Sequence, residues 1–482
     1  MMSAGSVRRG MWVPGLVALT VLAYLNGLAG PLQFDDYLLE ADRAAQDWAM
    51  WWGTIAYRIR PLLKASYIIS HSLGKALGSV PFGHHLFSLC VHLLTVVLAY
   101  RVARDLSTSI FPGVTGASGR ATAAGCAAVL ALHPLATEAI TYISGRSVAL
   151  ATLFVLASMA LHMRGSRETA AGARALWMGG AAVCYIAAVL TREAMIVLPA
   201  VLLFYEWSRA DRPETPFSAA RLIPAFRRTF GYWALAAAAL LWLLMHDGYE
   251  NLIAVSRVIV QGRVAEPSLL PALEYFAARL PLLAPLSIDP DLSPQDLSWP
   301  RRLVLALALA ALLAWAWRAR RRRPHGVLGL AWIMIFLLPV YLVPLRHDPV
   351  SERHFYPALF GVGLVASVEA ARLAARGKVA SRYVAAATGL LVIGMLGSTI
   401  VRNTDYISEV ALWASAARAS PGKPRVLNNL GVAHMKERRW DLAIPCFEHA
   451  LALDPGYRAA QENLDRAIIK LTTGDPDAEP EI

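Results

Sequence analysis

The sequence predicts an all-α membrane protein of about eleven transmembrane helices, with a short helical repeat module near the C-terminus. Of its 482 residues, 56% are hydrophobic and only 17% are charged, whereas soluble domains carry about 25% charged residues. The mean hydropathy is +0.45. Apolar runs long enough to cross a bilayer, which takes about 20 residues, recur between residues 11 and 401.

The expected spans follow from these apolar runs. They cover residues 11–30, 84–104, 121–142, 146–163, 175–191, 194–207, 230–246, 301–317, 326–345, 355–371 and 383–401. The span at 194–207 is short and follows the polar break Thr191-Arg192-Glu193. A further apolar stretch, Ser268–Ile288, contains Glu274, Arg279 and three prolines, so we interpret it as interfacial or re-entrant.

Arginines in the connections predict the orientation. Six Arg-rich groups fall on one side when eleven spans are drawn: Arg8/Arg9, Arg101/Arg104/Arg120, Arg164/Arg167/Arg174, Arg209/Arg212/Arg221/Arg227/Arg228, Arg318 with 320–323, and Arg372/Arg376/Lys378/Arg382. The positive-inside rule makes that side cytoplasmic. The long loops 31–83 and 247–300 and the C-terminus are then extracytoplasmic. Abundant Ala and Arg with few Lys is typical of a GC-rich bacterial source, so we expect a bacterial inner membrane.

After Val401 the pattern is that of a tetratricopeptide repeat. Its marker positions are Leu430, Gly431, Ala443, Phe447, Ala450 and Pro455. Trp413, Ala416 and Pro421 precede the last three of these by 34 residues, so a half-repeat comes before the full one. Three repeats are usually needed for independent stability. We therefore expect this module to be stabilised by packing against the membrane domain or against another chain.

Three segments result from this division. Residues 1–403 form the membrane domain. Residues 404–471 form the repeat module, with one full repeat at about 424–457 and flanking half-repeats. Residues 472–482, rich in Asp, Glu and Pro, form a disordered tail.

Charged side chains at membrane depth are costly and are functional hypotheses by default. Five clusters lie at the predicted extracytoplasmic ends: Asp35-Asp36, the region Arg58–Arg60, His133/Glu138/Arg146, Arg192-Glu193 and Glu352-Arg353. The cytoplasmic ends offer only the arginines that set topology. Gathering of acids and bases on one side is typical of an active site that faces out of the cell.

Each cluster also has a structural interpretation. Asp35-Asp36 can cap a helix, and His133-Pro134 can be a helix kink with a satisfied histidine. Arg192-Glu193 and Glu352-Arg353 can be ion pairs that only join helices. The tryptophans Trp48, Trp51 and Trp52 fit an interfacial belt better than a sugar-stacking platform. The joint presence of five clusters favours function.

Several ordered motifs resemble a known family. They are "FDDY", "YRIRPLLKASYIISHSLGKALGSVPFGHHLFSLCVHLL", "HPLATEAITYISGRSVALATLFVLAS", "LTREAMIVLPAVLLFYE", "PLSIDPDL" and "LPVYLVPLRHDPVSERHFYPALFGVGL". In this order they resemble the transmembrane and tetratricopeptide repeat-containing (TMTC-type) O-mannosyltransferases, which are GT-C glycosyltransferases. Two departures are the short repeat array and Thr191-Arg192-Glu193, where Ser-Lys-Glu is usual.

The resemblance implies transfer of a sugar, mannose in this family, from a polyprenyl-phosphate carrier to a Ser/Thr hydroxyl of an extracytoplasmic protein, with inversion. It places Asp35 as general base, and Asp36 as the residue that orients the loop. Donor phosphate would be held by Arg192 and Arg353, with Arg60 and Arg146 as further candidates. Glu193 and Glu352 would orient those arginines, and His133 and Glu138 would line the sugar or acceptor side.

Other functions remain to be weighed. A lipid-linked glycan polymerase or O-antigen-type ligase is also many-spanning, but lacks paired aspartates after the first span. A non-enzymatic repeat scaffold leaves the one-sided charges unexplained. A transporter lacks support because no inverted repeat is visible. Nucleic-acid binding has no signature, no Cys/His zinc pattern appears, and a divalent metal stays undetermined. The expected partners are the lipid-linked sugar, membrane lipid and an acceptor protein, the last engaged through the repeat module.

Overall fold

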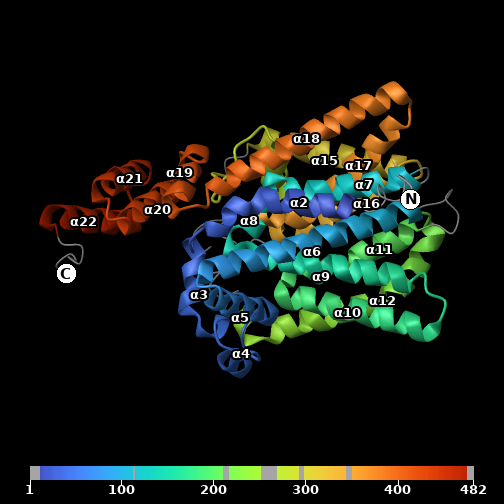
Figure 1. Ribbon diagram of the computed structural model, residues 1–482, viewed down its shortest axis with the longest axis horizontal. Coiled ribbons are helices and arrows are strands. Elements are labelled where there is room, and N and C mark those ends of the chain that lie inside the picture. Colours follow the sequence, from blue (N-terminus) through green and yellow to red (C-terminus); the bar gives the residue numbers. More distant parts are fainter. Residues whose placement is uncertain are drawn as a thin grey trace, which may run out of the picture.

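The computed structural model describes residues 11–111, 114–209, 217–250, 269–292, 298–342 and 350–474. In these residues every regular element is helical, which confirms the all-α prediction. Long helices lie side by side in one bundle, and a smaller helical module projects from one end of it (Figure 1). Helix α2 begins at the end of the bundle opposite to the module (Figure 1).

In the part of the chain that the structure describes, eleven helices of the bundle correspond in order to the predicted spans. They are α2 (Trp12–Tyr24), α6 (Val80–Ser109), α7 (Gly116–Leu132), α9 (Arg146–Gly165), α10 (Ala171–Thr191), α11 (Leu198–Ser208), α12 (Leu222–Met245), α15 (Trp299–Ala319), α16 (Pro324–Tyr341), α17 (Tyr356–Ala374) and α18 (Lys378–Thr404). Nine helical segments of the described residues are long and apolar enough to cross a membrane, and a bent pair makes a tenth. The chain is thus a multi-pass membrane protein.

Two predicted spans differ from straight helices. The tenth segment bends by 55° between Gly116–Leu132 and Pro134–Ile140, because Pro134 cannot continue the hydrogen bonding of the preceding helix. The expected span at 194–207 is α11, which has only 11 residues after the 3-10 turn η6 (Glu193–Val197). That length is below the roughly 20 residues a full span needs, so the eleventh span stays a prediction.

The site end of the bundle carries the short elements. They are η2 (Phe34–Asp36), α3 (Tyr37–Ala41), η3 (Arg43–Ala45), α4 (Trp48–Thr54), α5 (Pro61–Ala76), η4 (Pro134–Ala136), α8 (Thr137–Ile140), η5 (Ile143–Gly145), α14 (Leu269–Arg279) and η9 (Glu352–Phe355). Helix α14 is the structured part of the stretch 268–288. Its described part has 11 residues, and residues 251–268 before it lie outside the described part of the chain, so the interfacial interpretation stays a prediction.

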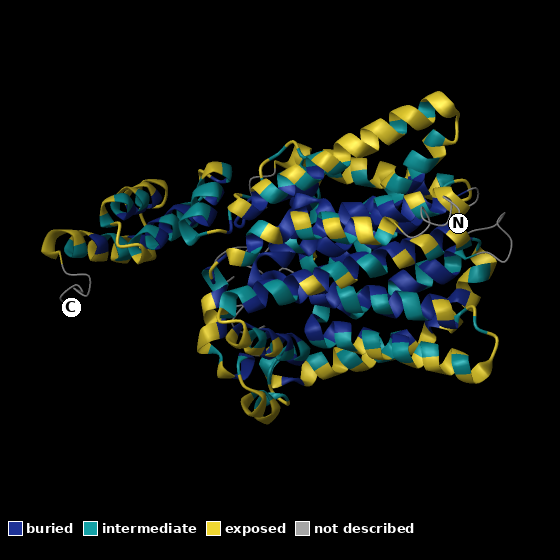
Figure 2. Cartoon of the chain, viewed as in Figure 1, coloured by how far each residue is buried: buried dark blue, intermediate teal, exposed yellow. Residues whose placement is uncertain are grey.

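Close helix contacts at the bundle centre depend on small residues. A Cβ on Gly363 of α17 would lie 2.6 Å from the carbonyl oxygen of Cys126 in α7, and Gly329 and Gly361 face each other between α16 and α17 in the same way. Helix α18, by contrast, is exposed along most of its length (Figure 2). Its outward side chains are apolar, Leu390 and Ile393 among them, as expected for a face that contacts lipid.

The Arg-rich connections meet one another at the end opposite to the site. Arg167 donates to Ser109 Oγ at 2.5 Å, Arg209 donates to the Ser166 carbonyl at 3.2 Å, and Arg372 donates to the Arg322 carbonyl at 2.9 Å. The structure therefore places these arginines at one end, as the sequence predicts. Their assignment to the cytoplasm stays a prediction.

The module comprises α19 (Glu409–Ala419), α20 (Pro424–Lys436), α21 (Trp440–Leu453) and α22 (Arg458–Thr473). Gly431 of α20 lets Phe447 of α21 pack closely, since a Cβ there would lie 2.5 Å from the Phe447 ring. Apolar residues of the module share one cluster with residues of the membrane domain. The expected tail from residue 472 begins inside α22, and residues 475–482 lie outside the described part of the chain.

Candidate active site

Asp36 is fixed by the protein. Its side chain is buried, and Oδ1 accepts hydrogen bonds from the Ser144 backbone N–H at 2.8 Å and the Ser144 hydroxyl at 2.7 Å. Oδ2 accepts from the Gln33 N–H at 3.3 Å. Burial raises the pKa of Asp36 to about 7, although the bonds from Ser144 and Gln33 oppose the shift. Asp36 therefore ties the first loop to η5; its orienting role in the reaction stays a prediction.

Asp35 differs from its neighbour. It is half-buried, and its backbone N–H donates to the Tyr142 hydroxyl at 3.2 Å. Among the described residues its carboxylate has no hydrogen-bond or ion-pair partner. The backbone is thus held while the carboxylate stays available to a ligand, which is the arrangement that a general base requires.

Arg353 and Asp35 both contact Tyr142. Its guanidinium carbon is 5.7 Å from the centroid of the Tyr142 ring, whose hydroxyl accepts the Asp35 N–H. Arg353 Nη1 is 3.0 Å from Glu138 Oε1, and the Arg353 backbone N–H donates to Glu138 Oε2 at 3.0 Å. Glu138 also accepts from the Ser351 hydroxyl at 2.8 Å. Glu138 therefore orients Arg353; it was expected to line the sugar or acceptor side.

Glu352 points away from Arg353. It is fully buried, and it accepts from the Tyr275 hydroxyl at 2.6 Å and the Ser287 N–H at 2.9 Å. Its cationic partner is Arg402 of α18, at 3.3 Å. Glu352 was expected to orient one of the candidate phosphate-binding arginines, but Arg402 is not among them. Glu352 instead fastens the second long loop to the last span.

Glu193 pairs with one of the candidate arginines, but not with its sequence neighbour Arg192. Glu193 binds Arg60 through two bonds of 2.9 and 2.5 Å. Burial alone would raise the pKa of Glu193, but the charge and hydrogen bonds of Arg60 lower it to about 2. Arg192 is buried and donates to the Ser147 hydroxyl at 2.9 Å. Glu193 therefore orients Arg60.

The guanidinium of Arg146 already donates its hydrogen bonds to groups of the protein. It is completely buried, and it donates to Ser88, Ser66, Ser70 and the carbonyl of His84 at 2.7–3.3 Å. A guanidinium has five N–H donors, so few remain for a ligand. Its expected role as a phosphate ligand does not fit this geometry. Arg146 instead joins α5, α6 and α9.

His133 is likewise structural. Its Nδ1 accepts from the Leu135 N–H at 3.2 Å, which caps the turn after the helix break. Its Nε2 donates to the Leu280 carbonyl at 3.2 Å, beyond the end of α14. The expectation that His133 lines the sugar or acceptor side is therefore not met, and the kink interpretation describes it.

Two tyrosines that sequence reasoning missed lie among the charged residues. Tyr142 contacts both Asp35 and Arg353, as described above. Tyr67 of α5 is buried, and its hydroxyl donates to the Ile143 carbonyl at 3.4 Å. Burial raises the pKa of Tyr67 to about 12, and the charges of Arg146, Asp36, Arg60 and Arg353 all act on it. Its place seven residues after Arg60, on the same face of a helix, was the available signal.

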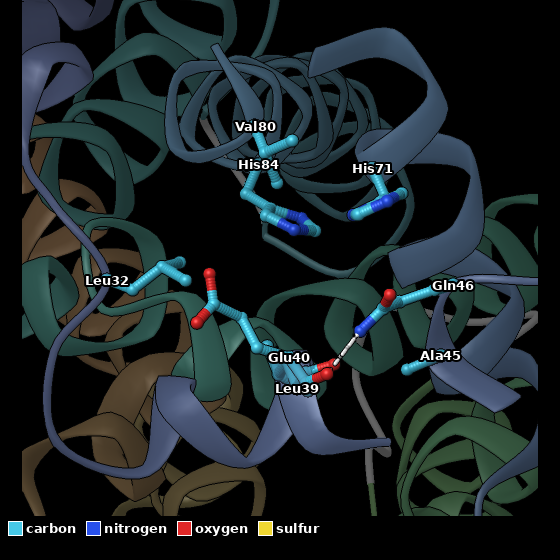
Figure 3. Close-up of a pocket in the computed structure, with 8 residues that line it drawn as sticks. All are labelled: Leu32, Leu39, Glu40, Ala45, Gln46, His71, Val80 and His84. Carbon is cyan, nitrogen blue, oxygen red and sulfur yellow. Dashed lines mark hydrogen bonds between the residues drawn. The ribbon is translucent and has the colours of Figure 1, made fainter. Parts of the chain in front are cut away.

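A small pocket opens beside the first loop (Figure 3). It is lined by Leu32, Leu39, Glu40, Ala45, Gln46, His71, Val80 and His84. Its volume open to the centre of a water molecule is about 10 Å³, which suits about one water and is far too small for a sugar. The described residues contain no group of three or more His, Cys, Asp or Glu that could hold a metal ion. The pocket therefore adds no second ligand site.

Fold and site together define a multi-pass helical membrane protein with charged groups gathered at the end that carries a tetratricopeptide module. The family model described as tetratricopeptide repeat matches residues 424–457. The chain is similar to protein O-mannosyl-transferase Tmtc3 of Drosophila melanogaster, with 24% identity over 453 residues that cover 81% of this chain and 48% of the relative. It is also similar to protein O-mannosyl-transferase Tmtc2 of Drosophila melanogaster (28% identity, 40% of this chain, 21% of the relative) and TMTC2 of Homo sapiens (27%, 39% and 23%).

These similarities confirm the resemblance found in the motifs. The chain spans about half the length of the first of these relatives and less of the others. No solved structure matches the chain.

Proposed function

We propose that this protein is an inverting membrane glycosyltransferase of the GT-C type. It transfers mannose from a polyprenyl-phosphate carrier to a Ser or Thr hydroxyl of a protein on the extracytoplasmic side. The observation that carries the proposal is the contrast within one dipeptide: Asp36 is buried and bound, whereas the carboxylate of Asp35 is half-exposed and has no partner among the described residues. The names of the similar proteins support mannose and a protein acceptor.

Asp35 acts as general base in the proposed reaction. The acceptor oxygen attacks C1 of the sugar from the face opposite to the phosphate, and its proton passes to Asp35. The bond between C1 and the phosphate oxygen breaks, and its electron pair stays on that oxygen. Attack and departure on opposite faces invert the anomeric centre. Asp36 contributes by holding the loop, through Ser144 and Gln33.

Arginines stabilise the charge that develops on the leaving phosphate. Arg353 is the first candidate, because its side chain is partly exposed and lies on the same tyrosine that binds Asp35. Arg60 is the second, because Glu193 fixes its guanidinium while about a quarter of the side chain remains exposed. Fixed donors aimed at developing charge supply a large part of many enzymatic rate enhancements. Arg192 is more deeply buried and acts beside them.

The proposed location is a bacterial inner membrane, with the repeat module outside the cell. No step of this mechanism is assigned to a metal ion.

The test is a transfer assay with purified full-length protein, radiolabelled polyprenyl-phosphate mannose and a Ser/Thr-rich peptide. Asp35→Asn keeps the shape of the side chain but removes the base, so single-turnover transfer should fall by about 10²–10⁴-fold while donor binding persists. Glu40→Gln is the matched control, because Glu40 is an exposed acid of the same loop. Near-normal transfer by Asp35→Asn would contradict the catalytic role, and no transfer by the wild type from any lipid-linked sugar would contradict the function.

A further inference from the structure

The repeat module contacts the loop that carries Asp35. Gln33 Nε2 donates to the Tyr406 carbonyl at 2.6 Å, in the segment between α18 and α19. The ring of Phe34 meets the ring of Trp413 of α19 edge to face, with 5.2 Å between centroids. These contacts involve the two residues that directly precede Asp35.

A third contact lies just after the aspartates. The Tyr37 hydroxyl donates to Glu409 at 3.3 Å, and the Lys436 ammonium lies 4.0 Å from the centroid of the Tyr37 ring. Lys436 also donates to Glu409 at 2.7 and 2.9 Å. The module therefore contacts the loop on both sides of Asp35 and leaves the carboxylate itself untouched.

The backbone at Phe34 needs such support. Phe34 has φ of +51°, in the left-handed region that bulky residues rarely adopt and that persists only where the surroundings enforce it. Its ring lies between two others: Tyr142 on one side, stacked at 6.4 Å, and Trp413 on the other. Because Phe34 directly precedes Asp35, the backbone conformation of Phe34 determines the direction in which the Asp35 side chain points.

Trp413 can contact Phe34 of the first loop because it belongs to a half-repeat. The equivalent residue 34 positions later, Phe447, packs on Gly431 of its own repeat. Trp413 has no such first helix within the module, since α18 precedes it as a membrane span. Its buried cluster is completed by Tyr142, Ile288 and Tyr406 from outside the repeat helices.

Polar contacts join the turn between α19 and α20 to the second long loop. Asp289 of the second long loop accepts from Arg425 at 2.6 and 2.7 Å, and from Lys423. The Ser420 hydroxyl accepts from the Asp291 N–H at 3.1 Å and meets the Ser287 hydroxyl at 3.2 Å. Helix α19, which carries Trp413, is therefore attached to the second long loop at its C-terminal end.

We propose that Trp413 is a positioning residue for the transfer reaction, and that the repeat module completes the active site by holding Phe34, and through it Asp35, in place. The inference rests on the proposed function for its kinetic consequence. Its structural part, the control of Asp35 by Trp413, does not depend on that function.

The kinetic test uses full-length Trp413→Ala and Trp413→Phe with a short peptide acceptor. Misplacement of a catalytic group by about 1 Å can cost 10²-fold in rate. We expect kcat of Trp413→Ala to fall by about 10–100-fold with KM little changed, and Trp413→Phe to recover most of the loss. Phe447→Ala is the matched control, because it removes the equivalent aromatic ring without a contact to the first loop. An equal loss in Phe447→Ala, or a change confined to KM, would overturn the proposal.

The second readout is independent of activity. Asp35→Cys is introduced into a protein whose native cysteines are replaced by alanine, and it is labelled with a membrane-impermeant maleimide. The labelling rate is compared between the protein that retains Trp413 and the proteins that also carry Trp413→Ala, Trp413→Phe or Phe447→Ala. Release of Phe34 should increase the rate severalfold in Trp413→Ala and in neither of the other two. An unchanged rate overturns the proposal. A raised rate in Trp413→Ala, together with no transfer by the wild-type protein in the peptide assay, would support the positioning role and contradict the proposed function.

Discussion

The two ends of the bundle both contain buried acids with cationic partners. They differ in whether a carboxylate remains without a protein partner and can bind a ligand. At the end with the Arg-rich loops, Glu206 is fully buried and contacts His162 at 3.1 Å, Arg228 at 3.1 Å and Arg209 at 3.6 Å. At the other end, the carboxylate of Asp35 has no partner among the described residues, although charged residues surround its loop. Charge alone therefore does not identify the functional end.

A second acid strengthens the comparison. Glu369 accepts from His325 at 2.7 Å and from Arg323 at 3.0 Å, again among the Arg-rich connections. The expectation that these ends carry only topology-setting arginines is therefore wrong. A buried charge that is fully paired acts as a structural tie, whereas an acid held by its backbone with a bare carboxylate can act on a ligand. The difference lies in the partners and not in the residue types.

The largest expected effect is an all-or-none difference in cysteine labelling. It tests which end of the bundle faces the outside of the cell. Cysteine at Gly474, beyond α22, should react with a membrane-impermeant maleimide in intact cells, whereas cysteine at Arg322 should react only after the membrane is opened. Both positions are exposed in the structure. A background without native cysteines removes the signal of Cys90, Cys184 and Cys446. The reverse pattern would place the site in the cytoplasm and exclude an extracytoplasmic acceptor.

The next effect separates a structural acid from a functional one. Glu206→Ala leaves buried His162 and the partly exposed Arg209 and Arg228 without this partner; because both arginines reach solvent, the cost is that of an unpaired buried polar group, about 1–3 kcal/mol. We expect the free energy of unfolding to fall by about this amount. Asp35→Asn breaks no side-chain contact, so its stability should stay within about 0.5 kcal/mol of wild type. Chemical denaturation in detergent measures both, and equal destabilisation of the two variants would remove the distinction between the ends.

Much of the architecture follows from the sequence, because it depends on composition and short-range pattern. Apolar runs predict ten of the expected spans, and the 34-residue spacing of Trp413 and Phe447 predicts the repeat. The gathering of the charged clusters at one end follows from the same topology. None of these inferences requires knowledge of which helix packs on which.

The ion pairs could not be predicted in the same way. Arg192 and Glu193 are adjacent in sequence, as are Glu352 and Arg353, but side chains of adjacent residues point in different directions. Each acid therefore binds an arginine from a distant element: Glu193 binds Arg60, 133 residues away, and Glu352 binds Arg402. By contrast, Glu206 with Arg209 and Glu369 with Arg372 have the spacing of one helical turn. That signal was present in the sequence and identifies the structural ties.

The smallest effect concerns Asp36 and the dependence of stability on pH. Its pKa is about 7 in the folded protein and near the ordinary value of 3.8 when unfolded. Between these two values the folded state binds more protons, so this residue stabilises the fold at acidic pH, and the contribution is lost as the pH rises from about 4 through 7. Asp36→Asn is neutral at every pH and lacks this dependence. The wild type should therefore lose thermal stability relative to Asp36→Asn between pH 5 and pH 8, measured as the difference in melting temperature of the two proteins in the same detergent. A difference that does not change with pH would mean that the Ser144 and Gln33 bonds keep Asp36 charged throughout, and that its burial does not set it apart from Asp35.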